Sequence, residues 1–187
     1  MENAFEAKEF EMFLTALRFA AEKHRDQRRK DSSRSPYINH PIAVAEILWR
    51  TGGVRDMITL TAALLHDTVE DTATSPDEIR AQFGEEVLSV VLEVTDDKHL
   101  PKARRKELQI ETAAHKSPRA RQLKLADKIN NVIDVTHTPP SDWSQERLRE
   151  YLDWTERVVD GMRGQNPRLE AEYDRVLAEG RAMLEKG

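Results

Sequence analysis

Apolar residues recur every three or four positions along most of the chain, and this helical period constrains the fold more than any other feature. The first periodic segment, residues 7–29, has its apolar side chains at Phe10, Phe13, Leu14, Leu17 and Ala20. No segment sustains the alternation of apolar and polar residues that predicts a β-strand. We therefore expect an all-α protein.

Start and stop signals divide the 187 residues into about eight or nine helices. Further helices are expected over approximately residues 85–94 and 101–115, and a last one opens at Asn166-Pro167. Gly52-Gly53 and Pro139-Pro140 are helix breakers. No repeat or plausible linker interrupts this pattern, so residues 1–187 are expected to form a single domain. Four N-cap candidates precede periodic segments: Asp56, Ser75, Ser117 and Ser144.

Composition excludes several kinds of function. The chain has no cysteine, so disulfides and thiolate metal sites are excluded. No apolar run approaches the roughly 20 residues of a membrane span, and the acidic N-terminus lacks the apolar centre of a secretion signal. A net charge of −5 argues against binding nucleic acid through a broad basic surface. We expect a cytoplasmic protein without a nucleic-acid or membrane partner, and oligomerisation is left open.

Basic residues nevertheless gather in two short regions, residues 23–34 and residues 102–106. A local basic cluster in an acidic protein suits a small anionic ligand that needs a focused field. For any single lysine or arginine, a solvated helix face is the simpler interpretation.

Four polar residues lie where the local pattern predicts core. The pair His66-Asp67 directly follows apolar Leu64-Leu65, Asp127 interrupts another apolar run, and His40 lies at the start of a helix. Imidazole and carboxylate groups are the ligands that a borderline divalent metal prefers. Taken singly, each residue also has a structural explanation, so spacing alone leaves the metal site undecided.

The flanking sequence adds a family resemblance. His40, His66-Asp67 and Asp127 match in type and order the H…HD…D signature of the HD-domain phosphohydrolases. The segments RRKD (28–31), PYINHP (36–41), ALLHDTVEDT (63–72) and KLADK (124–128) resemble the hydrolase domain of RelA/SpoT-type alarmone enzymes. The heptapeptide HDTVEDT is highly specific, whereas HD alone is weak. The length of the chain resembles that of the free-standing small hydrolases, including the metazoan homologue. The chain also resembles them at Asp134, where the long bifunctional enzymes usually have threonine.

The resemblance implies an all-α HD fold and removal of the 3′-pyrophosphate from guanosine tetra- or pentaphosphate, (p)ppGpp. It implies Mn²⁺ as the usual metal, with another divalent metal as the alternative, and His40, His66, Asp67 and Asp127 as ligands. Glu70 and Asp71 would handle the attacking water. Glu70 would orient or deprotonate that water, and Asp71 would assist proton transfer.

The phosphates of such a nucleotide need cationic partners, for which arginine and lysine are suited. Asn131 lies one helical turn after Asp127, so we expect it to face the same pocket and bind ribose or phosphate. Tyr151 is a candidate for sugar or phosphate contact, with core packing as the alternative. The full substrate-binding set is Arg29 and Lys30 first, then Lys102, Arg105 and Lys106, with Asn131 and Tyr151.

Three other functions stay open at this stage. The chain could be a phosphatase for another ribose-phosphorylated nucleotide such as NADPH, a binding module that senses alarmone without turnover, or a structural helical protein. Intact Glu70 and Asp71 argue against a pure sensor.

Overall fold

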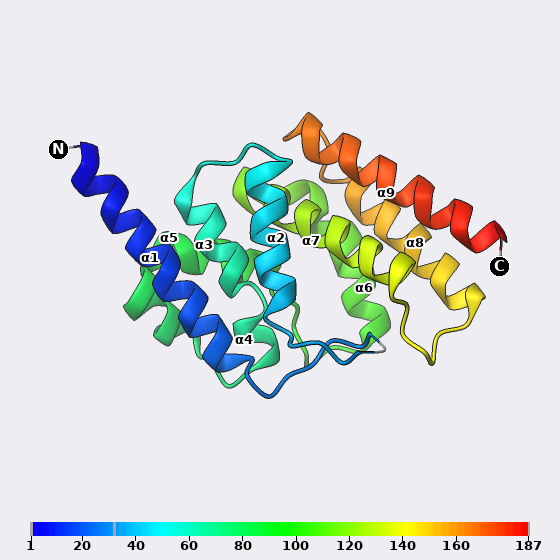
Figure 1. Cartoon of the computed structure of the whole chain (residues 1–187), viewed down its shortest axis with the longest axis horizontal. Coiled ribbons are helices and arrows are strands. Elements are labelled where there is room, and N and C mark those ends of the chain that lie inside the picture. The colour runs from blue at the N-terminus through cyan, green and yellow to red at the C-terminus, as the bar shows by residue number, and fades with distance from the viewer. Residues whose placement is uncertain (1, 32, 187) are drawn as a thin grey trace.

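The computed structural model describes residues 2–31 and 33–186, which form helices joined by loops (Figure 1). Within these ranges the only β-pairing is an isolated antiparallel bridge between Arg28 and Pro36, so the expected all-α class is confirmed. No described helix is both long and apolar enough to cross a bilayer. The elements are α1 Glu2–Lys23, α2 Asn39–Arg50, α3 Met57–Leu65, α4 Thr68–Asp71, α5 Pro76–Val94, α6 Lys102–Thr112, the 3₁₀ turn η1 Ala113–His115, α7 Pro118–His137, α8 Gln145–Asp160 and α9 Pro167–Lys186.

The four predicted N-caps all begin helices. The side chain of each accepts a hydrogen bond from the backbone N–H three residues later, which satisfies one of the unpaired donors of the first turn. The caps are Asp56 for α3, Ser75 for α5, Ser117 for α7 and Ser144 for α8.

One helix boundary differs from the expectation, and another agrees with it. α1 ends at Lys23 rather than near Arg29, because the apolar stripe stops at Ala20 and the polar residues after it have no core to cover. The expected helices from Ser75 and from Glu85 both form and are joined as α5 across a kink at Gly84, whose φ of 86° and ψ of 170° are not helical. Glycine alone adopts this backbone region readily, so it places a kink there.

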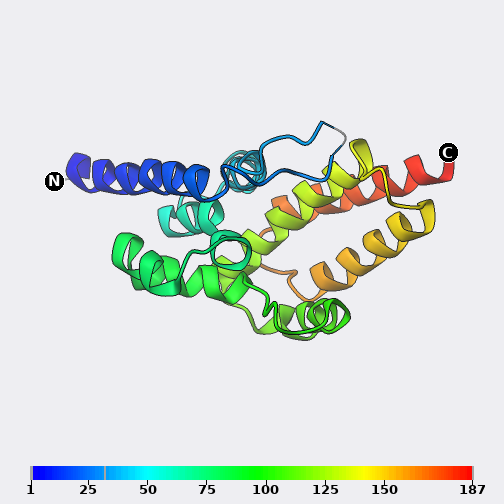
Figure 2. The same cartoon turned by 90° about the horizontal axis from the view of Figure 1, so that it is seen from below.

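Helix α7 lies at the centre of the molecule. It packs against α2, α3, α5, α8 and α9 (Figures 1 and 2). The buried apolar side chains form one continuous cluster, with members from α1, α2, α3, α5, α7, α8 and α9. Helix α6 contributes no buried residue and rests against α8. A rigid central helix and a peripheral cationic helix therefore border the polar site described next.

Candidate metal centre and clefts

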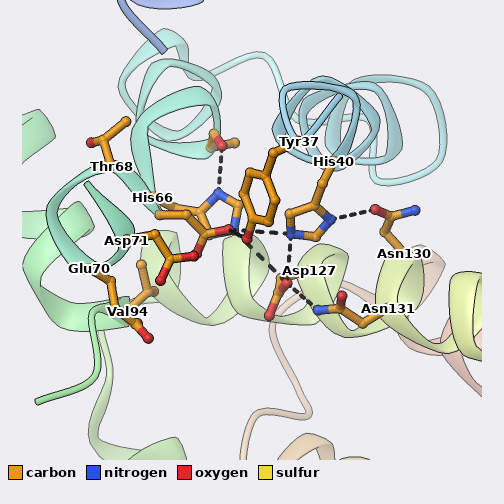
Figure 3. A network of polar contacts seen from close by, with 12 residues as sticks. Tyr37, His40, His66, Thr68, Glu70, Asp71, Val94, Asp127, Asn130 and Asn131 are labelled. Atoms are coloured by element: carbon orange, nitrogen blue, oxygen red, sulfur yellow. Dashed lines mark hydrogen bonds and ion pairs between the residues drawn. The ribbon is translucent and has the colours of Figure 1, made fainter. Parts of the chain in front are cut away.

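Polar side chains from α2, from the junction between α3 and α4, and from α7 converge on one point (Figure 3). One ligand atom each from His40, His66 and Asp67 lies within 4.8 Å of the others. Asp127 approaches from α7, with its Oδ1 atom 3.3 Å from His40 Nε2 and 3.9 Å from His66 Nε2. The structure thus brings together all four residues that the sequence suggested as ligands.

Local sequence explains how these side chains reach the point. His40 is the second residue of α2, just before a proline that suits the first helical turn. Every residue of α3 from Thr59 to Leu65 is buried, and His66 caps that helix from inside the core. Asp127 lies in the middle of α7, where neighbouring residues are buried as well.

The donor set fits a divalent metal. His40 Nδ1 lies 2.6 Å from Asn130 Oδ1, and His66 Nδ1 lies 2.8 Å from the Ala63 carbonyl oxygen. Because each acceptor requires the proton on Nδ1, both Nε2 lone pairs face the cluster, as metal-binding imidazoles require. His66 Nε2 is buried and makes no hydrogen bond within the described part of the chain.

Electrostatics keeps the carboxylates charged. Burial alone would raise the pKa of Asp67, but His66 and His40 beside it hold that pKa well below its usual range. Burial would likewise lower the pKa of His66, yet Asp67 and Asp127 raise it to about 9. A cation that binds His66 therefore displaces a proton from the metal-free cluster.

Tyr37 holds one of these carboxylates in place. Its hydroxyl donates to Asp67 Oδ2 at 2.6 Å, and its ring contacts those of His24 and His40. Burial and the nearby charge of Asp67 raise the pKa of Tyr37, so the phenol remains a donor at neutral pH. Tyr37 belongs to the PYINHP segment, but its contact with Asp67 could not be predicted from the sequence.

Glu70 and Asp71 lie in the single turn α4, which follows the metal cluster directly. Glu70 Oε2 accepts the backbone N–H of Asp96 at 3.0 Å, and Arg105 lies 3.7 Å from Glu70 Oε1. Burial raises the pKa of Glu70, as a general base needs. Asp71 accepts hydrogen bonds from Gln27, at 3.1 Å, and from Lys98.

A first cleft of about 430 Å³ opens between the loop after α1, α4 and α7. Arg29 hydrogen-bonds to Asn131, pairs with Asp134 and lies over the ring of Tyr37. Asn131 in turn donates to Asp127 Oδ1 at 2.6 Å. Lys30 also lines this cleft and is exposed. Asp134 thus neutralises the arginine, a pairing that sequence reasoning did not foresee.

A second cleft of about 490 Å³ lies between α6 and α8. Its cations are the expected Lys102, Arg105 and Lys106 and one unexpected residue, Arg147. Within the described residues Lys102 and Lys106 make no ion pair, whereas Arg147 reaches Asp142 at 3.9 Å. Trp143 and Tyr151 border both clefts.

Tyr151 therefore contributes a wall rather than filling the core, although it also packs against core residues. Trp143 and Trp154 also line the second cleft. In the sequence, Trp143 directly precedes the N-cap Ser144 and Trp154 lies 11 residues later. This spacing alone does not predict a cleft, because the cleft forms only where α8 meets α6.

Comparison with known proteins agrees with this geometry. Residues 16–153 match the HD domain family. The chain is 54% identical to the human guanosine-3′,5′-bis(diphosphate) 3′-pyrophosphohydrolase MESH1 over 84% of this chain and 88% of that protein. It is 52% identical to the Xenopus tropicalis protein of the same name, over 89% of this chain and 93% of that one.

Solved structures give the same relationship. A metazoan ortholog of SpoT that hydrolyzes ppGpp superimposes with a TM-score of 0.88 at 46% identity, covering 92% of this chain and 96% of that one. A Listeria monocytogenes protein, lmo0812, matches at a TM-score of 0.64 and 31% identity over 80% of this chain and 98% of that one. The chain therefore belongs to the HD domain family and, within it, to the group that contains the MESH1 proteins.

Proposed function

We propose that this protein is a metal-dependent hydrolase that removes the 3′-pyrophosphate from (p)ppGpp, giving GDP or GTP and pyrophosphate. The convergence of His40, His66, Asp67 and Asp127 beside Glu70 is the observation that carries the proposal. The names of relatives about half identical over most of the chain support the substrate.

In this proposal the four clustered residues hold a divalent cation, with Mn²⁺ the first candidate. Such a cation would polarise a phosphoryl oxygen and lower the pKa of an attacking water. Glu70 then accepts the proton of the water, since its raised pKa suits proton transfer near neutral pH. The bond that breaks joins phosphorus to the ribose 3′ oxygen, and Asp71 assists proton return to that oxygen.

The two clefts divide the substrate between them. Arg29 is already paired with Asp134, so the first cleft suits the nucleoside, with Asn131 reaching the ribose. The second cleft has lysines without ion pairs in the described structure, so it suits the distal phosphates. This assignment places Arg29 and Lys30 on the nucleoside side and Lys102, Arg105 and Lys106 on phosphate.

Tyr151 forms the wall between nucleoside and phosphates. We further propose that the 187 residues act as one domain, supported by their continuous core, and that they work in the cytoplasm, where nucleotide pools are found.

A product assay tests the proposal. Purified protein with Mn²⁺ is offered ppGpp, pppGpp and NADPH, and pyrophosphate and phosphate release are followed separately. Pyrophosphate from ppGpp, lost on chelation and in Asp67→Ala, is expected. Phosphate from NADPH without pyrophosphate from ppGpp would assign the site to NADPH instead, and metal-dependent binding of ppGpp without turnover would leave an alarmone sensor.

A further inference from the structure

Two buried lysines flank Asp127 on α7, and neither belongs to the residues expected in the site. Lys124 precedes Asp127 by three residues and Lys128 follows it directly; their side chains are 9% and 4% exposed. Their Nζ atoms lie 3.8 Å and 3.5 Å from Asp127 Oδ2. A buried ammonium is costly unless a negative group compensates it, so both lysines depend on this carboxylate.

The two oxygens of Asp127 face different partners. Oδ1 accepts a hydrogen bond from Asn131 at 2.6 Å and lies 3.3 Å from His40 Nε2, on the metal side. Oδ2 faces the two ammonium groups. With Oδ2 occupied in this way, the carboxylate presents one oxygen to a metal rather than two.

Each lysine is fixed by a second contact away from Asp127. Lys124 donates to the carbonyl oxygen of Val94 at 3.4 Å, at the end of α5. Lys128 lies over the indole ring of Trp154, 4.5 Å from its centroid, a favourable cation–π arrangement. Because these contacts come from α5 and α8, the ammonium groups cannot follow Asp127 if it rotates.

The two lysines add positive charge to the candidate metal centre. Asp67 and Asp127 carry two negative charges and the lysines carry two positive charges, so these four groups are neutral before a metal binds. A divalent cation, bound by neutral imidazoles, then leaves an excess of two positive charges at the centre. Without the lysines the loaded centre would be neutral and would attract a phosphate anion less strongly.

We propose that Lys124 and Lys128 are positioning residues, which hold Asp127 as a ligand through Oδ1 alone and keep the metal-loaded centre positive toward the phosphate anion. This inference rests on the proposed function, since it takes the four-residue cluster to bind a divalent metal. The inference predicts that the two lysines weaken binding of the metal and strengthen binding of the phosphate anion.

The test replaces each lysine by methionine, which conserves length and removes the charge. Mn²⁺ titration of metal-free Lys124→Met and Lys128→Met by calorimetry at pH 7 is expected to give a Kd at least about tenfold lower than wild type, because a positive charge near the cation is gone. The Mn²⁺-induced rise in Tm should grow correspondingly, while kcat/KM for ppGpp falls. Lys128→Arg keeps the charge and should restore both values toward wild type.

Lys23 offers a matched control, since it makes the same two kinds of contact with residues that are not candidate metal ligands. Its Nζ lies 2.7 Å from Glu78 Oε1 and 5.0 Å from the Phe19 ring centroid. Lys23→Met should leave the Mn²⁺ Kd unchanged.

Mn²⁺ binding in the lysine variants that is unchanged or weaker than wild type would overturn the inference, because a purely structural lysine can only weaken the site when lost. Circular dichroism checks folding, and Lys124→Gln or Lys128→Gln replaces a methionine variant that does not fold. A wild-type protein that binds no Mn²⁺ would refute the proposed function as well. If wild type binds Mn²⁺ and cleaves ppGpp, the proposed function stands, and a contrary result in the lysine variants refutes only the inference about Lys124 and Lys128.

Discussion

Replacing Tyr37 by phenylalanine removes one oxygen atom from beside the metal cluster and leaves the packing of the ring intact. The lost hydroxyl donates to Asp67 Oδ2 at 2.6 Å in a mostly buried position. A hydrogen bond to a charged group contributes about 1.5–3 kcal/mol to stability. Asp67 keeps His66 Nε2 at 3.1 Å and His40 Nε2 at 3.6 Å, so the lower figure is the better expectation.

For a chain of this size, 1 kcal/mol corresponds to roughly 2–4 °C in Tm. Metal-free Tyr37→Phe should therefore melt about 3–6 °C below metal-free wild type. The metal effect is larger, because losing a partner that orients a ligand typically weakens metal binding about 10–100-fold. The difference in Tm between wild type and Tyr37→Phe should therefore be larger with Mn²⁺ than without it.

Differential scanning calorimetry with and without Mn²⁺ measures both effects. Tyr173→Phe is the control: its buried hydroxyl donates to Thr155 Oγ1 at 2.9 Å, away from the metal. It should lower Tm by a comparable amount yet leave Mn²⁺ affinity unchanged. Equal Mn²⁺ affinity in Tyr37→Phe and wild type would refute the idea that Tyr37 orients Asp67.

Three further perturbations address the base, the nucleoside cleft and the packing of α9. Since burial raises the pKa of Glu70 above its ordinary 4.5, kcat/KM should rise with pH through a pKa above that value; Glu70→Gln should lose this limb and about 10²-fold or more in kcat while still binding Mn²⁺ in calorimetry. Arg29→Ala should raise KM for ppGpp about tenfold with little change in kcat, because its contacts to Asn131 and Asp134 serve binding; an equal loss in kcat would place Arg29 in the chemistry. Gly180→Ala puts a Cβ 2.6 Å from Thr136 Oγ1, so urea denaturation should show a loss of about 1–3 kcal/mol, and unchanged stability would mean that α9 shifts freely.

Local signals in the sequence predicted the helices well, because caps act through neighbouring atoms. Ser75 and Ser144 bind the backbone three residues on, and no distant contact is needed to form these caps. The end of α1 was wrong because nothing local stops the chain between Lys23 and Arg29. That boundary depends on where the core ends, which is a property of the folded molecule.

The metal candidates could be named for a similar reason, since polar residues within apolar runs are conspicuous in one dimension. The residues that contact these candidates could not be named from the sequence. Arg29 and Asp134 are 105 residues apart, and Tyr37 and Asp67 are 30 apart. The first pairing exists only after the loop between α1 and α2 meets α7, and the second only after that loop meets the end of α3. Lys124 and Lys128 were visible beside Asp127, but only their burial shows that they face its carboxylate.

The central helix also limits how this protein can change during evolution. Asp127 faces the candidate metal site, Asn131 donates to Asp127, and Asp134 pairs with Arg29, all from successive turns of α7. Each residue inserted in a helix rotates everything beyond it by about 100°. A single insertion between Asp127 and Asp134 would turn Asp134 away from the candidate metal site, whereas a change in the length of the loop after His137 would keep these three residues in register. Variation in length among relatives should therefore spare α7 and collect in its flanking loop, which a family alignment can check.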